Sequence, residues 1–200
     1  MIINHSKRFI FIAVAKTGCT SVYRRFGFAA HPYGDWIPPE PKIYHMHLSD
    51  ILRQNPETKD YFKFAFVRNP YDRLISAYFD FKNNPQHKDW AFPIYKYDSF
   101  GQFVKDLYDK KFPEDDWIHL HRQFDYLQAD SKVNLDYIGR FETLQQDMKN
   151  IESLLGLKHT PLNKERSSRH DHFASYYTSD IKRMVYEIYK EDFIEFGYEQ

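Results

Sequence analysis

Residues 9–21 read FIFIAVAKTGCTS, and residues 64–78 read FAFVRNPYDRLISAY. Each segment is an apolar run that stops at a cation, Lys16 or Arg68, and continues as a plausible helix. Such runs are typical of strands that are buried on both faces of a parallel sheet. In an α/β protein they present positive charge and backbone N–H groups at the carboxyl ends of the strands. The two segments together predict a ligand with phosphate at both ends.

The rest of the chain alternates strand-like and helix-like segments. We expect strands over 8–14, 63–67 and 137–141, and helices over 20–28, 47–55, 70–82, 99–110, 142–155 and from 179 onward. Three of these helices have candidate N-cap residues, namely Ser49, Asn69 and either Asp98 or Ser99. Strands separated by helices predict an α/β fold class, with a central, mostly parallel sheet flanked by helices in one three-layer domain over residues 1–200.

Composition limits the classes of function. The 28 basic and 28 acidic side chains balance, so no field of the whole molecule points to a nucleic acid or an acidic membrane as partner. Cys19 is the single cysteine and cannot form an internal disulfide. No apolar stretch is long enough for a membrane span, and the first strand leaves no room for a signal peptide, so we expect a cytoplasmic protein. The aromatic content of 18% suits a heavy core or stacking on a ligand ring.

Lys16 occupies the place of a phosphate-binding lysine, between a strand and a helix. The nucleoside-triphosphate loop has the pattern G-x-x-x-x-G-K-[ST], but here Ile10 and Ala15 stand where its two glycines belong. Glycine follows the lysine instead, at Gly18, which predicts a shorter loop around a smaller anionic group. The alternative is a surface lysine in an ordinary strand-to-helix turn.

Arg68 ends the second apolar run, where its planar guanidinium can hold a phosphate through two parallel hydrogen bonds. Ser76 lies two turns into the following helix, on the same face as Arg73, and its hydroxyl can donate to the same phosphate. The alternative for Arg68 is a local ion pair with Asp72.

These segments resemble known motifs. Residues 16–21 resemble the 5′-phosphosulfate loop of sulfotransferases that use 3′-phosphoadenosine 5′-phosphosulfate (PAPS), although Ala13 and Ala15 replace residues more usual there. Residues 67–78 are similar to the 3′-phosphate motif of the same enzymes. The resemblance is to the carbohydrate sulfotransferases, the group with the chondroitin, dermatan, HNK-1 and heparan 2-O enzymes. Residues 137–144 and 192–198 also resemble segments of that family.

The resemblance implies a P-loop-like fold, PAPS as co-substrate, 3′-phosphoadenosine 5′-phosphate (PAP) as product and no metal requirement. It implies that the 5′-phosphosulfate is lined by Lys16, Thr17, Gly18, Cys19, Thr20 and Ser21. Arg68 and Ser76 would hold the 3′-phosphate. Arg166 and Ser167 lie in a basic segment that would cover the nucleotide or contact an anionic acceptor, with a solvated connector as the alternative.

Transfer of a sulfuryl group to a hydroxyl needs a cation at the leaving oxygen and a base for the acceptor proton. Lys16 is the candidate cation. Residues 44–48, YHMHL, resemble the His-x-His segment of heparan 2-O-sulfotransferases, which implies His47 as base and His45 as its assistant. Further His-x-His pairs at 119/121 and 170/172 raise zinc as an alternative, but no acidic companion pattern accompanies them.

Our hypothesis from the sequence is therefore a PAPS-dependent O-sulfotransferase that acts on an acceptor hydroxyl, of a sugar or a glycoconjugate. Two alternatives remain open at this point. One is an ATP-dependent P-loop kinase, which the missing glycines disfavour. The other is a non-catalytic module that binds a nucleotide or a sulfated glycan.

Overall fold

The computed structural model describes residues 1–27, 45–83, 93–111, 117–163 and 171–200. The chain divides into two compact units. The first unit comprises Met1–Arg68 and Gln123–Arg166, and the second comprises Asn69–Arg122 and Ser167–Gln200.

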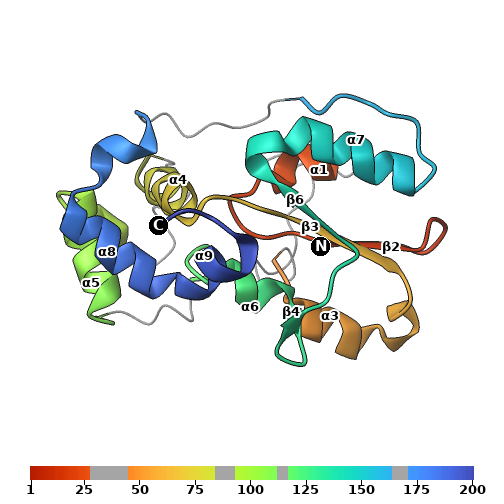
Figure 1. The fold of residues 1–200 in the computed structure, drawn as a ribbon, viewed down its shortest axis with the longest axis horizontal. Coiled ribbons are helices and arrows are strands. Elements are labelled where there is room, and N and C mark those ends of the chain that lie inside the picture. The colour runs from red at the N-terminus through yellow and green to blue at the C-terminus, as the bar shows by residue number, and fades with distance from the viewer. Residues whose placement is uncertain (28–44, 84–92, 112–116, 164–170) are drawn as a thin grey trace. The chain divides into compact units, whose positions relative to one another are not determined.

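A four-stranded sheet forms the centre of the first unit (Figure 1). Its strands, in spatial order, are β1 (Ile2–Asn4), β2 (Phe9–Ile12), β3 (Phe62–Val67) and β6 (Tyr137–Arg140). β1 is antiparallel to β2, whereas β2, β3 and β6 run parallel, with Phe11 opposite Phe64 and Phe64 opposite Tyr137. The predicted mostly parallel sheet is therefore confirmed.

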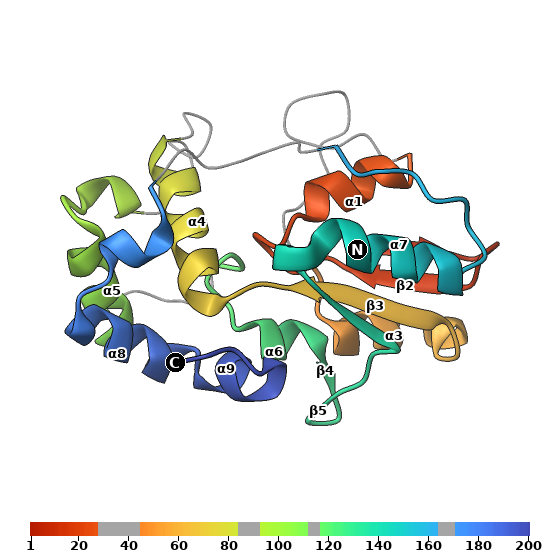
Figure 2. The same ribbon diagram turned by 45° about the horizontal axis from the view of Figure 1, so that its top comes forward.

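Helices cover both faces of this sheet, as Figures 1 and 2 show from two directions. α1 (Cys19–Arg25) and α7 (Leu144–Leu154) lie on one face, and α3 (Leu48–Gln54) lies on the other. Because side chains alternate across a strand, both faces of β2 need apolar residues, and all four of its residues are buried. The first unit therefore has the predicted three-layer α/β architecture. Its remaining elements are α6 (Gln123–Leu127), a hairpin of β4 (Gln128–Ala129) and β5 (Lys132–Val133), and the 3₁₀ turns Pro56–Thr58 and Phe141–Thr143.

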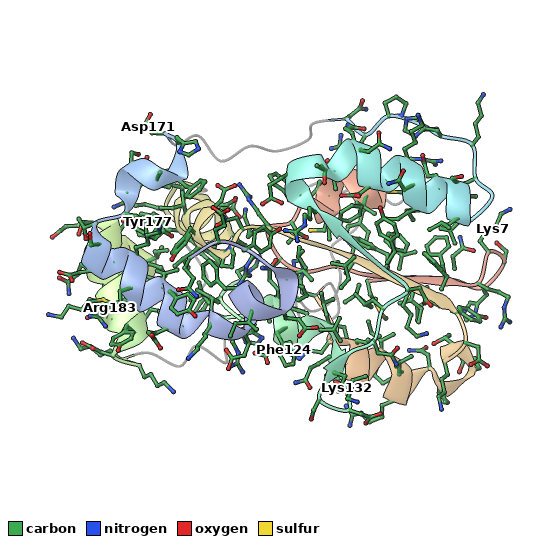
Figure 3. All side chains as sticks on the ribbon, viewed as in Figure 1. Lys7, Phe124, Lys132, Asp171, Tyr177 and Arg183 are labelled. Atoms are coloured by element: carbon green, nitrogen blue, oxygen red, sulfur yellow. The ribbon has the colours of Figure 1, made fainter. Side chains whose placement is uncertain are left out.

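The second unit is helical within its described residues. It contains α4 (Pro70–Asn83), α5 (Phe100–Tyr108), α8 (Ser179–Ile188), α9 (Lys190–Phe196) and the 3₁₀ turns Pro93–Lys96 and Phe173–Tyr176. Aromatic side chains dominate its core, and Tyr177, labelled in Figure 3, donates a hydrogen bond to the carbonyl of Tyr71 at 2.8 Å. This packing accounts for much of the high aromatic content. No described helix is both long enough and apolar enough to cross a membrane.

The boundaries agree with the sequence where cap residues fix them. Asn69 Oδ1 accepts a hydrogen bond from the N–H of Tyr71 at 2.9 Å, and Ser99 Oγ accepts one from the N–H of Gln102 at 3.2 Å. The prediction of Ser49 as an N-cap is wrong, because α3 already begins at Leu48 and its N-cap residue is His47.

Other differences arise from tertiary pairing. The strand expected over 8–14 pairs only over 9–12, and the helix expected over 20–28 spans 19–25. The C-terminal helix is two helices, α8 and α9. The elements β1 and α6 were not expected from the sequence. The loop expected over 29–43 lies outside the described residues.

Candidate functional site

The chain turns sharply after β2, in the loop that carries Lys16. Lys16 and Gly18 have φ angles of +67° and +82°, one on each side of Thr17. A tight turn of the backbone can direct successive N–H groups toward one concave side, which suits an anion. The loop therefore combines such a turn with the ammonium group of Lys16.

Gly18 is required by packing as well as by its φ angle. A Cβ atom at this position would lie 2.9 Å from Cδ2 of Leu144 and 3.2 Å from Cδ2 of Phe141. Both neighbours belong to the segment that follows β6, so the loop lies tightly against the start of α7. The glycine that follows the lysine in the sequence has this physical reason.

The other side chains of the loop make internal contacts. The hydroxyl of Thr17 is buried and donates to the carbonyl of Val14 at 2.9 Å. Cys19 belongs to the core between the sheet and α1, where burial raises the pKa of its thiol. Ser21 donates to the carbonyl of Asn163 at 2.9 Å. We therefore expect Thr17 and Cys19 to meet a bound anion through their backbone N–H groups.

Arg68 brings the second predicted anion segment to this loop. Its Nη1 donates to the carbonyl of Lys16 at 3.1 Å, and its guanidinium carbon lies 4.1 Å from the centre of the Phe141 ring. Arg68 is also buried. Lys16 and Arg68 therefore lie together at the carboxyl ends of adjacent parallel strands. Ser76 is buried on α4 in the second unit, so its pairing with Arg68 on one phosphate stays a prediction.

Gln123, at the start of α6, is the last of residues 121–123, which resemble an acceptor-side segment of the family. The sequence did not indicate its contact with Arg68. Its Oε1 accepts from the N–H of Arg68 and its Nε2 donates to the carbonyl of Arg68, both at 2.8 Å. The side chain is completely buried. Its partner Arg68 lies 55 positions away in the sequence, so only the folded chain reveals this contact.

His45 anchors the start of the loop. Its Nδ1 lies 2.7 Å from the carbonyl oxygen of Ala13, and because a carbonyl only accepts, Nδ1 carries the hydrogen. Burial lowers the pKa of His45 to about 3, against a smaller opposing effect of this hydrogen bond. His45 is therefore neutral near pH 7, which suits a supporting contact to the loop.

His47, the candidate base, is half-buried at the start of α3. Its ring lies 4.7 Å from the ring of Tyr126, centre to centre, at an interplanar angle of 70°. Since His47 follows His45 by two residues, their Cα atoms are at most about 7 Å apart. His47 thus lies near the backbone segment that leads into the Lys16 loop.

Residues 1–199, almost the whole chain, match the sulfotransferase family. The chain belongs to the sulfotransferase family. The resemblance of its motifs to that family is thereby confirmed.

Individual relatives are carbohydrate sulfotransferases. Carbohydrate sulfotransferase 11 of Mus musculus is 26% identical over 235 residues, which cover 99% of this chain and 66% of the relative. Carbohydrate sulfotransferase 12 of Xenopus laevis is 28% identical over 170 residues, which cover 70% of this chain and 40% of the relative. Carbohydrate sulfotransferase 10 of Xenopus laevis is 30% identical over 200 residues, which cover 80% of this chain and 53% of the relative. The chain thus spans between 40% and 66% of the length of these three relatives. No solved structure matches the chain.

In this member of the sulfotransferase family, the second unit joins parts of two motif segments, residues 69–78 and 192–198. Arg73 is buried, and its Nη2 lies 3.9 Å from Oδ2 of Asp192, which is also buried. Nη2 also donates to the carbonyl of His121 at 2.7 Å, and Nη1 donates to that of His119 at 3.3 Å. Arg73 therefore holds the backbone at both histidines, and the ring of His119 packs edge-on against Phe81.

The remaining predicted residues divide between exposed and undescribed parts of the chain. Arg166, Ser167 and His170 lie outside the described residues. His172 is exposed and accepts a hydrogen bond from the N–H of Ala174 at 3.4 Å. Within the described ranges, no three histidine, cysteine or acidic side chains gather in a way that could hold a metal ion.

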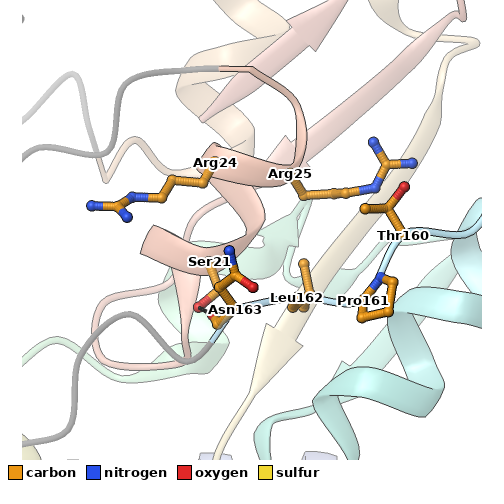
Figure 4. Close-up of a pocket in the computed structure, with 7 residues that line it drawn as sticks. All are labelled: Ser21, Arg24, Arg25, Thr160, Pro161, Leu162 and Asn163. Atoms are coloured by element: carbon orange, nitrogen blue, oxygen red, sulfur yellow. Dashed lines mark hydrogen bonds between the residues drawn. The ribbon is translucent and has the colours of Figure 1, made fainter.

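A cavity of about 140 Å³ adjoins the loop in the first unit (Figure 4). It is lined by Ser21, Arg24 and Arg25 of α1 and by the segment 160–163. Arg25 pairs with the buried carboxylate of Glu152 and also donates to the carbonyl of Lys158 at 2.7 Å. Ser21 belongs both to the predicted loop and to the cavity wall.

Proposed function

We propose that this protein is a PAPS-dependent O-sulfotransferase that transfers a sulfuryl group to an acceptor hydroxyl of a sugar or glycoconjugate. The observation that carries the proposal is the hydrogen bond from Arg68 to the carbonyl of Lys16. It links two cationic strand ends at one edge of a parallel sheet, where α/β proteins bind nucleotides. Membership of the sulfotransferase family supports the same reaction.

The residues take separate roles in this proposal. The loop from Lys16 to Ser21 holds the 5′-phosphosulfate through backbone N–H groups and the Lys16 ammonium. Arg68 and Ser76 hold the 3′-phosphate. His45 assists by fixing the carbonyl of Ala13, through the 2.7 Å contact of its Nδ1, and so the start of the loop.

The reaction is an in-line displacement at sulfur. The acceptor oxygen forms a bond to sulfur while the bond from sulfur to the 5′-phosphate oxygen breaks, and PAP leaves with the electron pair of that bond. His47 takes the proton of the acceptor hydroxyl, because an imidazole has a pKa suited to a base near neutral pH. The Lys16 ammonium stabilises the negative charge that develops on the leaving oxygen.

Nucleotide binding tests the first part of the proposal. Isothermal titration is expected to show binding of PAP that ATP with Mg²⁺ does not match. Tighter binding of ATP with Mg²⁺ would favour a kinase and contradict the proposal. Adenosine 5′-phosphate (AMP) is the matched control ligand, because it lacks only the 3′-phosphate that Arg68 is proposed to hold.

Turnover tests the second part. A screen of sugar and glycoconjugate acceptors with radiolabelled PAPS is expected to yield a sulfated product. His47→Ala is expected to abolish transfer and to keep the affinity for PAP. PAP binding without transfer to any acceptor would favour a non-catalytic binding module, and full turnover of His47→Ala would move the base to another residue.

A further inference from the structure

The side chain of Gln123 clamps the backbone of Arg68. Its amide accepts the N–H of Arg68 and donates to the carbonyl of the same residue, each over 2.8 Å. Gln123 has no exposed surface, so water does not compete for either hydrogen bond. A buried amide with both of its backbone partners in place holds them in one relative orientation.

The hydrogen bonds from Gln123 act just beyond the end of β3, where no described strand of the sheet pairs with the chain. The pairing of β3 with β2 ends at Ala65, opposite Ile12, and its pairing with β6 ends at Val67, opposite Arg140. Arg68 is therefore one residue beyond the ladder. A primary amide carries a donor and an acceptor side by side, as a peptide group does. Gln123 thus supplies the hydrogen bonds that a neighbouring strand would otherwise give to Arg68.

The guanidinium of Arg68 depends on this backbone orientation. It stacks on Phe141 with its central carbon 4.1 Å from the ring centre, and its Nη1 reaches the carbonyl of Lys16 at 3.1 Å. A rotation of the backbone at Arg68 would move its Cβ atom, and would so disturb the contacts of the guanidinium with Phe141 and with the Lys16 carbonyl. Hydrogen bonds of a charged donor are strong but depend on geometry.

We propose that Gln123 is a positioning residue of the co-substrate site, which sets the direction of the Arg68 guanidinium toward a 3′-phosphate. The proposal rests on the proposed function. Gln123 touches no reacting atom in this role and acts through Arg68. A purely structural glutamine would stabilise the fold without any effect on the choice between ligands.

The test compares two ligands that differ only in the 3′-phosphate. The affinity of PAP divided by the affinity of AMP is measured by titration for the wild type and for Gln123→Met, which keeps the volume of the side chain and removes its hydrogen bonds. The ratio is expected to fall about tenfold, because a misaligned charged hydrogen bond is lost only with PAP. A parallel loss of both affinities, or an unchanged ratio, would overturn the proposal.

Gln145 provides a matched control. Its Oε1 accepts from the N–H of Leu162 at 2.9 Å, and its Nε2 donates to the carbonyl of Leu162. Gln145→Met therefore removes the same kind of clamp from a backbone segment other than that of Arg68. We expect it to leave the PAP to AMP ratio within about twofold of the wild type. A fall equal to that of Gln123→Met would contradict a specific role of Gln123.

A double-mutant cycle shows whether Gln123 acts through Arg68. In an Arg68→Met background, Gln123→Met is expected to cause no further fall of the ratio, because no guanidinium remains to be positioned. An additional fall of about tenfold there would overturn the proposal.

Thermal unfolding shows whether the Gln123 variants fold, and the affinities of the wild type for PAP and AMP test the proposed function by themselves. If Gln123→Met does not fold, Gln123→Asn is measured instead, because it keeps an amide on a stem too short to clamp Arg68. Failure of both variants to fold would overturn the proposal, since the hydrogen bonds from Gln123 to the Arg68 backbone would then be required for folding. A wild type that binds AMP as tightly as PAP would show that the proposed function fails, before any variant of Gln123 is considered.

Discussion

The Nη1 atom of Arg68 donates a hydrogen bond to the carbonyl oxygen of Lys16 over 3.1 Å, between residues 52 positions apart in the sequence. The bond joins the loop that follows β2 to the end of β3. Since the same guanidinium stacks on Phe141, Arg68 fixes the loop as well as presenting its own charge. A change at Arg68 is therefore expected to reach both predicted anion-binding segments.

Arg68→Lys is expected to weaken the binding of PAP by about tenfold or more. A lysine ammonium has no planar face to stack on Phe141 and no fork that serves a phosphate and the Lys16 carbonyl together. Isothermal titration measures the affinity. Arg53→Lys is the control, because Arg53 is exposed and pairs with Asp50 on α3. Equal affinities of Arg68→Lys and the wild type would contradict this role of Arg68.

Lys16→Ala and Lys16→Gly separate charge from backbone strain. Lys16 has a φ angle of +67°, which costs a non-glycine residue on the order of 1 kcal/mol. Both variants are expected to lower turnover by about 10² to 10³-fold, because the charge at the leaving oxygen is lost. Urea unfolding is expected to find Lys16→Gly more stable than Lys16→Ala by about 1 kcal/mol. The reverse order of stability would show that the strain is absent.

Gly18→Ala is expected to lower the free energy of unfolding by about 2 to 4 kcal/mol. The added Cβ meets both an unfavourable φ of +82° and the side chain of Leu144 at 2.9 Å. Gly27→Ala is the matched control, because Gly27 has a φ of +78° and no atom of the described residues lies within 4 Å of the place that its Cβ would take. We expect a loss of about 1 kcal/mol for this control. Equal losses of unfolding free energy in the two variants would mean that the Leu144 side chain moves aside without cost.

His45 is expected to make the fold sensitive to acid. Burial lowers the pKa of His45 from 6.5 to about 3, so between these pH values the unfolded chain binds a proton that the folded chain does not. The stabilising contribution is complete above about pH 6.5 and falls toward pH 3, by up to about 1.4 kcal/mol per pH unit. His45→Asn keeps an N–H for Ala13 and does not titrate. Urea unfolding at several pH values is expected to give this variant a shallower slope than the wild type, and identical slopes would contradict the prediction.

Asp192→Asn is expected to destabilise the second unit by about 3 kcal/mol, because it removes the buried carboxylate charge that faces the buried guanidinium of Arg73. The adjacent residue gives the control. Glu191 forms an exposed ion pair with Arg122 at 3.1 Å, and Glu191→Gln is expected to cost less than about 1 kcal/mol. Thermal or urea unfolding measures both variants. Similar losses at the two positions would show that burial does not determine the cost.

Much of the fold could be predicted from the sequence because its signals are local. The continuous apolar runs before Lys16 and Arg68 indicate buried parallel strands, and the pattern of strands and helices places helices on both faces of the sheet. Asn69 and Ser99 were recognisable as caps, since a cap acts within three residues of itself. The prediction for Ser49 was wrong because it relied on residue type alone. α3 begins at Leu48, and its N-cap residue, His47, makes no side-chain cap hydrogen bond that residue type could indicate.

The contacts that shape the candidate site could not be predicted in this way. The sequence places Thr17 and Cys19 in the loop. In the structure, the Thr17 hydroxyl donates to the carbonyl of Val14 and the Cys19 side chain lies in the core. Whether a side chain points to a ligand or to the interior depends on the packing around it. That packing includes residues far away in the sequence.

Residue type and spacing alone were enough to recognise the two cationic segments, the parallel sheet that carries them and the family to which their motifs belong, because these properties are expressed locally. The contacts of Arg68 with Lys16, of His45 with Ala13 and of Gln123 with Arg68 became known only from the folded chain. These partners lie 52, 32 and 55 positions apart. No local pattern encodes such a pair, since only the folding of the sheet and its helices brings the two ends together.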